Sequence, residues 1–341
     1  MKKLLVLATF VCAAAVATAP AQEPTAVAST NTARPHSGIN ISISPFIQQG
    51  FGYTKWIMEV RGLIDSGIIG TVKSELDYPL NSVNGGLELR IGSGPSAYKD
   101  WSIALSVSTD LKDPTHVMKD YDWIFIPGGF NGGISYTESS VKMTSLQGSL
   151  QGQLTLARSG KSRFGMLAGV RYQHFDQKLY DLAGWQLDSA NERFYFDVYQ
   201  DTLVGTYKIT YTMPNIGLFY RLQFNEGSSV ELNGAFMVPF MSDEDDHVLR
   251  NRLATASSSG TGYFGEIKVR LSSSKTRGKR PFVELSGQLM GIDARPKQTI
   301  YWYGDDPITP EFNDTGSRLP GIPHHVISKQ QFLTTKVGVM F

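Results

Sequence analysis

The chain has 341 residues, of which 18% are charged and 34 are glycine. Lys plus Arg number 32 and Asp plus Glu number 31, so the chain has no basic excess that would indicate a nucleic-acid partner. Abundant glycine and 11% aromatic residues favour an all-β protein over a helical bundle or a disordered chain. The single cysteine, Cys12, lies in the leader described next. Disulfides, cysteine-ligated metals and a cysteine nucleophile are therefore excluded from the mature chain.

Residues 1–21 have the pattern of a secretory signal peptide. Two lysines precede an apolar run, and a small-residue cleavage site follows immediately before Gln22. The run is shorter than a comfortable membrane-spanning helix. Residues 22–37 are rich in Pro, Ala, Thr and Ser, which predicts a flexible N-terminal segment. The remaining residues, 38–341, are expected to form the folded domain.

Apolar and polar residues alternate with period two through the rest of the chain. In 145–156, for example, leucines and glycines alternate with Ser, Gln and Thr, which is the pattern of a half-exposed β-strand. The segments that we expect to form strands are 39–60, 71–92, 99–112, 141–158, 163–177, 200–224, 229–242, 258–272, 281–293 and 331–341.

Strand length and turn asymmetry distinguish a membrane barrel from a soluble sandwich. Many of the expected strands are longer than the usual five or six residues or so, and their polar faces carry Ser, Gln, Thr and Gly. Short turns alternate with the long stretches 112–140, 178–199, 243–257 and 293–330, and the chain ends on an aromatic residue, Phe341. These features predict an all-β fold, a ten-stranded antiparallel transmembrane β-barrel with long extracellular loops, located in the bacterial outer membrane.

Strand parity brings acidic residues and a histidine to the lumen side of the barrel mouth. In 229–242 the odd positions face inward, and the same parity places Asp243, Asp245 and His247 on the inner face. Similar reasoning from 101–111 places Asp120 and Asp122 inward, although Pro114 favours a register change. A carboxylate beside an imidazole orients and charges a general base. The alternative interpretation of such a run is solvated charge or a loose calcium site.

Several segments in this order resemble the omptins, a family of ten-stranded outer-membrane endoproteases. The segments that carry the resemblance are Ser74-Glu75-Leu76-Asp77-Tyr78, Met118-Lys119-Asp120-Tyr121-Asp122-Trp123, Gly165-Met166-Leu167-Ala168-Gly169, Tyr207-Lys208 with Met213-Pro214-Asn215-Ile216-Gly217-Leu218, and Asp243-Glu244-Asp245-Asp246-His247. The resemblance extends over about 40–341, with Asp-x-Asp-Trp and Asp-x-Asp-x-His as its most specific elements.

The resemblance implies an outer-membrane endopeptidase that uses no cofactor and no metal. Asp120 and Asp122 match the acidic couple of the family, and Asp245 and His247 match its Asp–His dyad. His247 is then expected to polarise a water held between it and Asp120, and this water attacks the scissile carbonyl directly. Asp243, and Glu59 after a shift of about two residues, match acidic residues that select a basic substrate side chain.

One part of the family pattern is missing from the outer surface. Omptins bind lipopolysaccharide phosphates with a charged cluster on the outer barrel surface. At the matching positions this chain has Val170, Tyr172, His174 and Thr210, so most of the cluster is absent. The protein either does without lipopolysaccharide or contacts it through other residues such as Arg171 or Lys208. The expected partners are peptide or protein substrates with basic residues and outer-membrane lipid, and the expected state is a monomer with its active site facing outward.

Two further interpretations are weighed against an endopeptidase. A non-catalytic barrel, such as an adhesin or a structural porin-like protein, would share the fold, and only the matched site residues separate it from a protease. Another surface hydrolase, such as a lipase, would need a serine nucleophile near a histidine, which the sequence does not place. The pair His324-His325, which follows Pro323, is predicted to be solvent-exposed in a loop rather than to bind a metal.

Overall fold

The structure is a computed structural model that describes residues 38–65, 68–93, 100–188, 193–225, 227–273, 279–307 and 313–341. The predicted signal peptide, residues 1–21, and the predicted flexible segment, residues 22–37, lie outside the described residues. Nothing within the described ranges is a helix with the length and apolar character needed to cross a membrane.

The described chain is almost entirely β-strand, in one antiparallel sheet. Its elements are β1 (Ile39–Asp65), β2 (Ile68–Pro79), β3 (Val83–Ser93), β4 (Trp101–Lys112), β5 (Met118–Phe125), β6 (Asn131–Ser159), β7 (Ser162–Asp188), β8 (Arg193–Val198), β9 (Leu203–Gln223), β10 (Ser229–Met237), β11 (Phe240–His247), the 3₁₀ helix η1 (Val248–Arg250), β12 (Arg252–Ser272), β13 (Arg280–Ala294), β14 (Lys297–Trp302) and β15 (Arg318–Met340).

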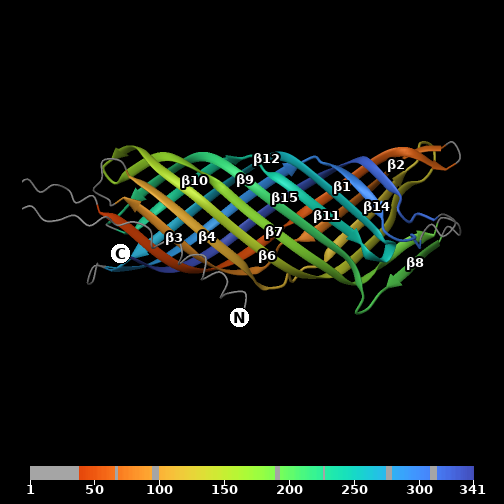
Figure 1. The fold of residues 1–341 in the computed structure, drawn as a ribbon, viewed down its shortest axis with the longest axis horizontal. Coiled ribbons are helices and arrows are strands. Elements are labelled where there is room, and N and C mark those ends of the chain that lie inside the picture. The colour runs from red at the N-terminus through yellow and green to blue at the C-terminus, as the bar shows by residue number, and fades with distance from the viewer. Residues whose placement is uncertain are drawn as a thin grey trace, which may run out of the picture.

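The sheet closes into a ring because β15 pairs with β1. Four positions of the ring are each filled by two consecutive strands, namely β2 with β3, β4 with β5, β10 with β11, and β13 with β14. Single strands fill the other positions, and β8 is a short addition to β7. The ring therefore has ten positions, which confirms the predicted ten-stranded barrel. Figure 1 shows the strands tilted across the long axis, as closure of a sheet requires.

Each of the four breaks within a ring position coincides with a proline. Pro79 ends β2, Pro114 lies between β4 and β5, Pro239 between β10 and β11, and Pro296 between β13 and β14. Proline has no N–H to donate to the ladder, so the hydrogen-bonding pattern is interrupted there while the chain continues in the same direction.

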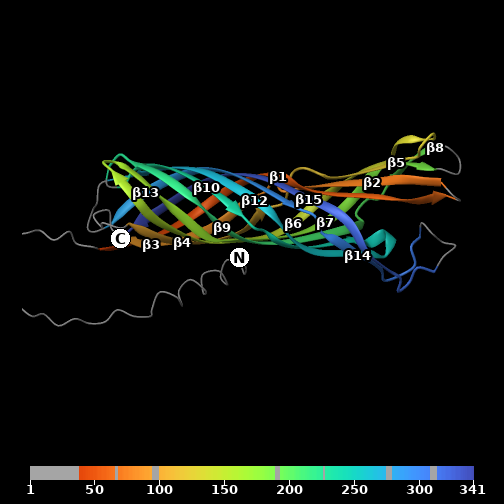
Figure 2. The same ribbon diagram turned by 90° about the horizontal axis from the view of Figure 1, so that it is seen from above.

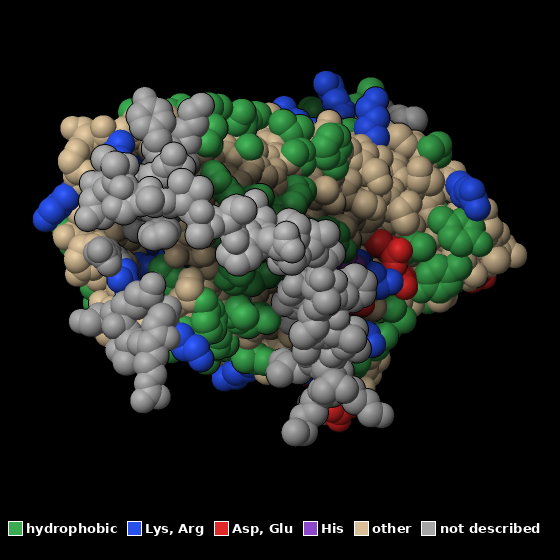
Figure 3. Space-filling view, turned by 60° about the vertical axis from the view of Figure 1, so that its left-hand side comes forward, with side chains coloured by type: hydrophobic (Ala, Val, Ile, Leu, Met, Phe, Trp, Pro, Cys, Tyr) green, Lys and Arg blue, Asp and Glu red, His purple; other side chains and the backbone are tan. Residues whose placement is uncertain are grey.

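The outer surface of the half nearest Phe341 carries many exposed apolar side chains, and Figure 3 shows patches of them among polar atoms on one face. The exposed apolar side chains there include Ile43, Ile47, Leu105, Leu150, Met166, Leu218, Leu232, Ile267, Leu285 and Leu333. Farther along the same strands the exposed residues become polar or charged, such as Lys142, Thr144, Lys178, Thr255 and Ser257. The apolar half is the part that matches a membrane core.

The stretches predicted as long loops are mostly strand, which corrects that expectation. β5, the first part of β6, most of β11 and all of β14 fall within 112–140, 243–257 and 293–330, and β7 continues to Asp188. The strands thus continue past the apolar half. Figure 2 shows that at this end β2, β5 and β8 lie together on one side, with β14 on the other. We call this end the site end.

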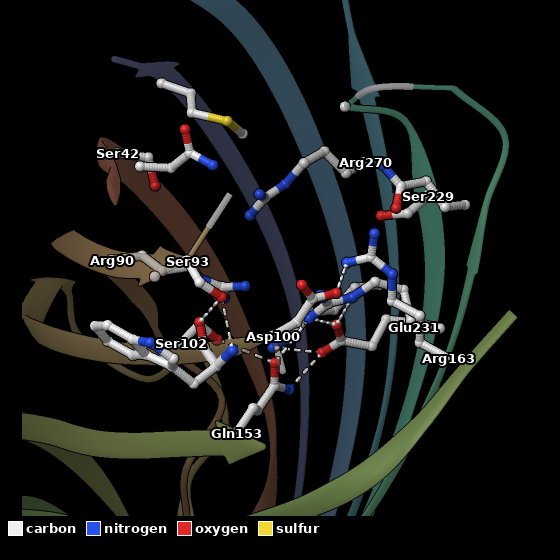
Figure 4. A pocket seen from close by; sticks show the side chains of 18 of the residues that line it. Ser42, Arg90, Ser93, Asp100, Ser102, Gln153, Arg163, Ser229, Glu231 and Arg270 are labelled. Atoms are coloured by element: carbon white, nitrogen blue, oxygen red, sulfur yellow. Dashed lines mark hydrogen bonds and ion pairs between the residues drawn. The ribbon is translucent and has the colours of Figure 1, made fainter. Parts of the chain in front are cut away.

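Paired charges line the lumen of the apolar half. Lys268 contacts Glu266 at 3.0 Å and Arg270 contacts Glu284 at 2.6 Å. A cavity of about 250 Å³ lies at the end near Phe341, and Figure 4 shows Arg90, Asp100, Arg163 and Glu231 around it. These ion pairs satisfy charges that face inward in a closed barrel, and they lie far along the strands from the acidic residues of the site end.

Candidate functional site at the site end of the barrel

The acidic run of β11 alternates as its parity predicts. Asp243 and Asp245 are both 5% exposed, whereas the side chain of His247 is 25% exposed. β11 pairs with β9 on one side and β12 on the other, which holds Asp245 between Tyr207 and Ala254. The three inward residues of β11 therefore line the lumen above the apolar half.

Asp245 and His247 form a hydrogen-bonded pair. Oδ2 of Asp245 lies 3.0 Å from Nε2 of His247. β11 ends at His247, and the chain turns through η1 to Asn251, which has the left-handed conformation (φ 49°) that asparagine tolerates well. This tight turn places Arg252, the first residue of β12, directly opposite His247.

The second pair of acidic residues comes from the opposite wall. β5 pairs with β2 and with β6, so that Asp120 lies opposite Leu76 and Thr137. Ser135 on β6 donates a hydrogen bond from Oγ to Oδ2 of Asp122 at 2.7 Å. Oδ1 of Asp120 is buried and has no hydrogen-bond partner among the described residues. This oxygen remains free to accept a bond from a bound molecule.

Tyr78 connects the two walls. It lies on β2, is fully buried, and donates a hydrogen bond from its hydroxyl to Oδ1 of Asp245 at 3.2 Å. Its ring stacks on that of Tyr207 with centroids 3.8 Å apart and an angle of 10° between the planes. Both oxygens of Asp245 are thus engaged, one by Tyr78 and the other by His247.

The pKa values of Asp245 and Asp120 are shifted in opposite directions. Burial alone would raise the pKa of Asp245, but the charge and hydrogen bond of His247, with Arg252 and Tyr78, outweigh burial and lower it. Burial raises the pKa of Asp120 well above its usual value, and the charges of Asp122 and Asp245 raise it further. Asp245 therefore favours its ionised form, and Asp120 readily keeps a proton, as expected for one of two neighbouring carboxylates.

Asp243 has a partner that the sequence did not suggest. Its Oδ2 lies 3.2 Å from Nε2 of His324 on β15, whose side chain is completely buried. The prediction that His324 is solvent-exposed in a loop is wrong, because β15 begins at Arg318 and brings this residue to the inner face. His325 faces the other way and contacts Asp293 at 3.0 Å.

Glu59 is not brought to this cluster. It is exposed on β1, where the alternation gives it the outer face together with Lys55 and Ile57. The inner face at this level carries Trp56, which is 4% exposed, and Met58. The four residues Asp120, Asp122, Asp245 and His247 are positioned around one part of the lumen, with Asp243 one inward step away on β11.

Sequence analysis assigned no role in the site to three residues that lie there: Tyr78, Arg252 and His324. Arg252 and His324 follow the period-two alternation of their strands, and Tyr78 lies within one of the segments quoted for the family resemblance. Parity extended through these segments would have placed them inward. The partners of Tyr78 and His324 could not be found from the sequence, because each contact joins β11 to a strand far away in the chain.

The arrangement has the parts that direct hydrolysis needs. An ionised carboxylate beside an imidazole supports general-base chemistry, and a buried carboxyl oxygen without a partner can hold a water. A closed, tilted antiparallel barrel with an apolar outer band and a polar lumen is an outer-membrane protein. Fold and site together define the class of outer-membrane barrel proteases.

Comparison with known proteins gives the family. The model of the Omptin family matches residues 70–286, which is more than half of the chain. The chain therefore belongs to the omptin family. The crystal structure of the outer membrane protease OmpT from Escherichia coli is similar, with a TM-score of 0.62 and 18% sequence identity over 92% of this chain and 99% of that one. A search of curated proteins by sequence gave no match.

Proposed function

We propose that the protein is an endopeptidase that cleaves peptides or proteins next to basic residues, with water as the nucleophile. Membership of the omptin family makes it an outer-membrane protease with peptide or protein substrates. The observation that carries the finer proposal is the Asp245–His247 pair, at 3.0 Å, on the wall opposite Asp120 and Asp122.

In the proposed reaction, His247 acts as the general base. A water held between its imidazole and Asp120 attacks the scissile carbonyl carbon, and the water proton passes to the imidazole. The tetrahedral intermediate then collapses, the C–N bond breaks, and His247 returns the proton to the leaving amine. No covalent bond to the enzyme forms at any step. Asp245 orients the imidazole and stabilises its charged form.

Arg252 and Asp122 set the charge around this water. Arg252 lies opposite His247, and its positive charge acts on both Asp245 and Asp120 to lower their pKa. Asp122 acts in the reverse direction on Asp120. Because Asp120 accepts a hydrogen bond from the water, its ionised form is the active one in this proposal, and the balance between these two neighbours sets the pH at which it becomes available.

Substrate preference is assigned to Asp243. This residue precedes Asp245 by two positions on the same face, and successive inward residues of a strand lie about 7 Å apart. A long Arg or Lys side chain bound beside the scissile bond can reach that distance, and a buried carboxylate attracts a cation more strongly than an exposed one does. Glu59 is exposed on the outer face of β1, so it contributes to substrate binding only from the rim of the barrel.

Orientation and lipid contacts complete the proposal. The site end faces the cell exterior, because the opposite end carries Phe341 and the short turns that outer-membrane barrels place in the periplasm. The protein acts as a monomer. Arg171 faces the lumen, where it lies 4.0 Å above the ring of Phe264, so any lipopolysaccharide contact involves outward residues such as Lys208.

The proposal is tested by incubating the refolded barrel with two peptides that differ only by Arg or Gln at one position. We expect cleavage beside Arg, with products identified by mass spectrometry and the rate greatly reduced for Gln. Equal cleavage of both peptides would refute the basic preference, and cleavage of neither peptide would refute the endopeptidase assignment.

A further inference from the structure

A buried histidine holds the proposed specificity residue. His324 lies on β15, and its side chain has no exposed surface, while the side chain of Asp243 is 4% exposed. The two residues are 81 positions apart in the chain, and Nε2 of His324 lies 3.2 Å from Oδ2 of Asp243. The pair therefore joins β15 to β11 across the lumen, one inward step away from Asp245.

Aromatic side chains enclose the pair. The ring of Trp56 lies 5.3 Å from that of His324, and Tyr207 is fully buried beside Asp243, whose charge acts on its hydroxyl. Four buried polar atoms of this group have no hydrogen-bond partner within the described ranges: Oδ1 of Asp243, Nδ1 of His324, Nε1 of Trp56 and the hydroxyl of Tyr207. Buried polar atoms are normally satisfied, so this cluster has capacity left for a bound group.

The free Nδ1 indicates which form of the imidazole is present. A buried N–H without an acceptor costs free energy of folding, and a buried unprotonated ring nitrogen without a donor costs less. The neutral tautomer with its proton on Nε2 therefore fits these contacts best, and it donates that proton to Asp243. In this form His324 adds a hydrogen bond without cancelling the charge of the carboxylate.

Asp243 needs such a donor in order to stay ionised. Burial raises its pKa, and the hydrogen bond from His324 opposes this effect in part. Without the donor, burial would favour the neutral carboxyl, which attracts a guanidinium or ammonium group only weakly. The hydrogen bond also occupies Oδ2 and leaves Oδ1 as the oxygen available to a substrate side chain.

We propose that His324 is the positioning residue of Asp243 and that the preference for basic substrates depends on it. This inference rests on the proposed function, in which Asp243 selects the basic side chain. His324 is not a catalytic residue, because it acts on the substrate only through Asp243. It determines specificity by keeping the carboxylate of Asp243 ionised and by occupying Oδ2, so that Oδ1 is available to the substrate.

The test compares His324→Leu, which has no donor, with His324→Gln, which keeps an N–H within reach of Asp243. The measured quantity is the ratio of kcat/KM for the Arg and Gln peptides. We expect His324→Leu to lower this ratio about tenfold or more, the effect of losing one hydrogen bond to a charged group, and His324→Gln to keep most of it. The matched control is His325→Leu, one position along on the outer face, which should leave the ratio unchanged.

A second comparison separates positioning from general damage. In an Asp243→Asn background, His324→Leu should cause no further fall in the ratio, because its effect passes through Asp243. Heat-modifiable gel mobility verifies that each variant forms the barrel. If His324→Leu does not fold, His324→Asn replaces it, since its shorter side chain withdraws the donor from Oδ2.

The outcomes are distinguishable. A folded donor-less variant with the wild-type ratio would overturn the inference while leaving the proposed function intact. An equal fall in His324→Gln and the donor-less variant would also overturn it. A wild-type ratio near one would instead refute the basic preference itself, before any variant is made.

Discussion

The hydroxyl of Tyr78 donates a hydrogen bond to Oδ1 of Asp245 at 3.2 Å, and this contact joins β2 to β11 across the lumen. The other oxygen of Asp245 is bonded to His247. The carboxylate that orients the proposed general base is therefore itself held from the opposite wall, which also carries Asp120 through the pairing of β2 with β5. Within the barrel, Tyr78 thus adds a direct hydrogen bond between the two halves of the site.

Tyr78→Phe should lower kcat by about tenfold with little change in KM, because it removes one hydrogen bond to a charged group without altering the packing against Tyr207. Steady-state kinetics on the Arg peptide measure this. Tyr211→Phe is the matched control, since Tyr211 is an equally buried tyrosine of β9 with no hydrogen bond to Asp245. Equal losses in the two variants would contradict the role given to Tyr78.

Asp122→Asn should extend activity to lower pH. The charge of Asp122 raises the pKa of Asp120, after the larger effect of burial, so its removal lets Asp120 ionise at a lower pH. If the ionised form holds the water, the acid limb of the pH–rate profile moves down by about one unit. An acid limb that stays in place would show that Asp120 does not control it.

Arg252→Gln should move the same limb in the opposite direction. The guanidinium lowers the pKa of both Asp245 and Asp120, so its loss makes both carboxyls harder to ionise. The acid limb then moves to higher pH, while the rate at the alkaline plateau changes less. A downward shift like that of Asp122→Asn would exclude an electrostatic role for Arg252.

Asp243→Asn should weaken cleavage of Arg peptides while sparing the reaction itself. Losing one partner of a desolvated ion pair reduces the Arg-to-Gln ratio of kcat/KM by at least about tenfold. The absolute rate on the Gln peptide serves as the internal control, because it does not involve the pair. An unchanged ratio would show that Asp243 does not contact the substrate side chain.

The alternation of apolar and polar residues was sufficient to predict the ten-stranded ring and the inward residues of one wall of the site. Parity carried from 229–242 placed Asp243, Asp245 and His247 inward, and the structure has this arrangement despite the break at Pro239. The same reasoning passed Pro114 and still placed Asp120 and Asp122 correctly beside the lumen. In this barrel the breaks at Pro114 and Pro239 interrupt the hydrogen bonding, but the residues that follow keep the facing of the strand before the break.

The parts of the strands near the site end were harder to recognise from the sequence. Pro320, Gly321 and Pro323 gave 293–330 the composition of a loop, and this concealed the inward alternation that begins at His324. A lipopolysaccharide contact through Arg171 would require an outward side chain, but its neighbour Tyr172 is the exposed one. Contacts across the lumen, such as that of His324 with Asp243, depend on barrel closure, which no local pattern contains.

His247→Ala gives the most direct test of the central claim, that an Asp–His pair at the barrel mouth drives peptide hydrolysis. The measurement is kcat/KM on the Arg peptide for wild type and variant, each shown to be heat-modifiable on a gel. Loss of a general base lowers the rate by about 10²–10⁴-fold. We predict a loss of this size with the barrel intact, because His247 lies beyond the apolar half and is partly exposed. A folded His247→Ala variant that retains full activity would contradict the account.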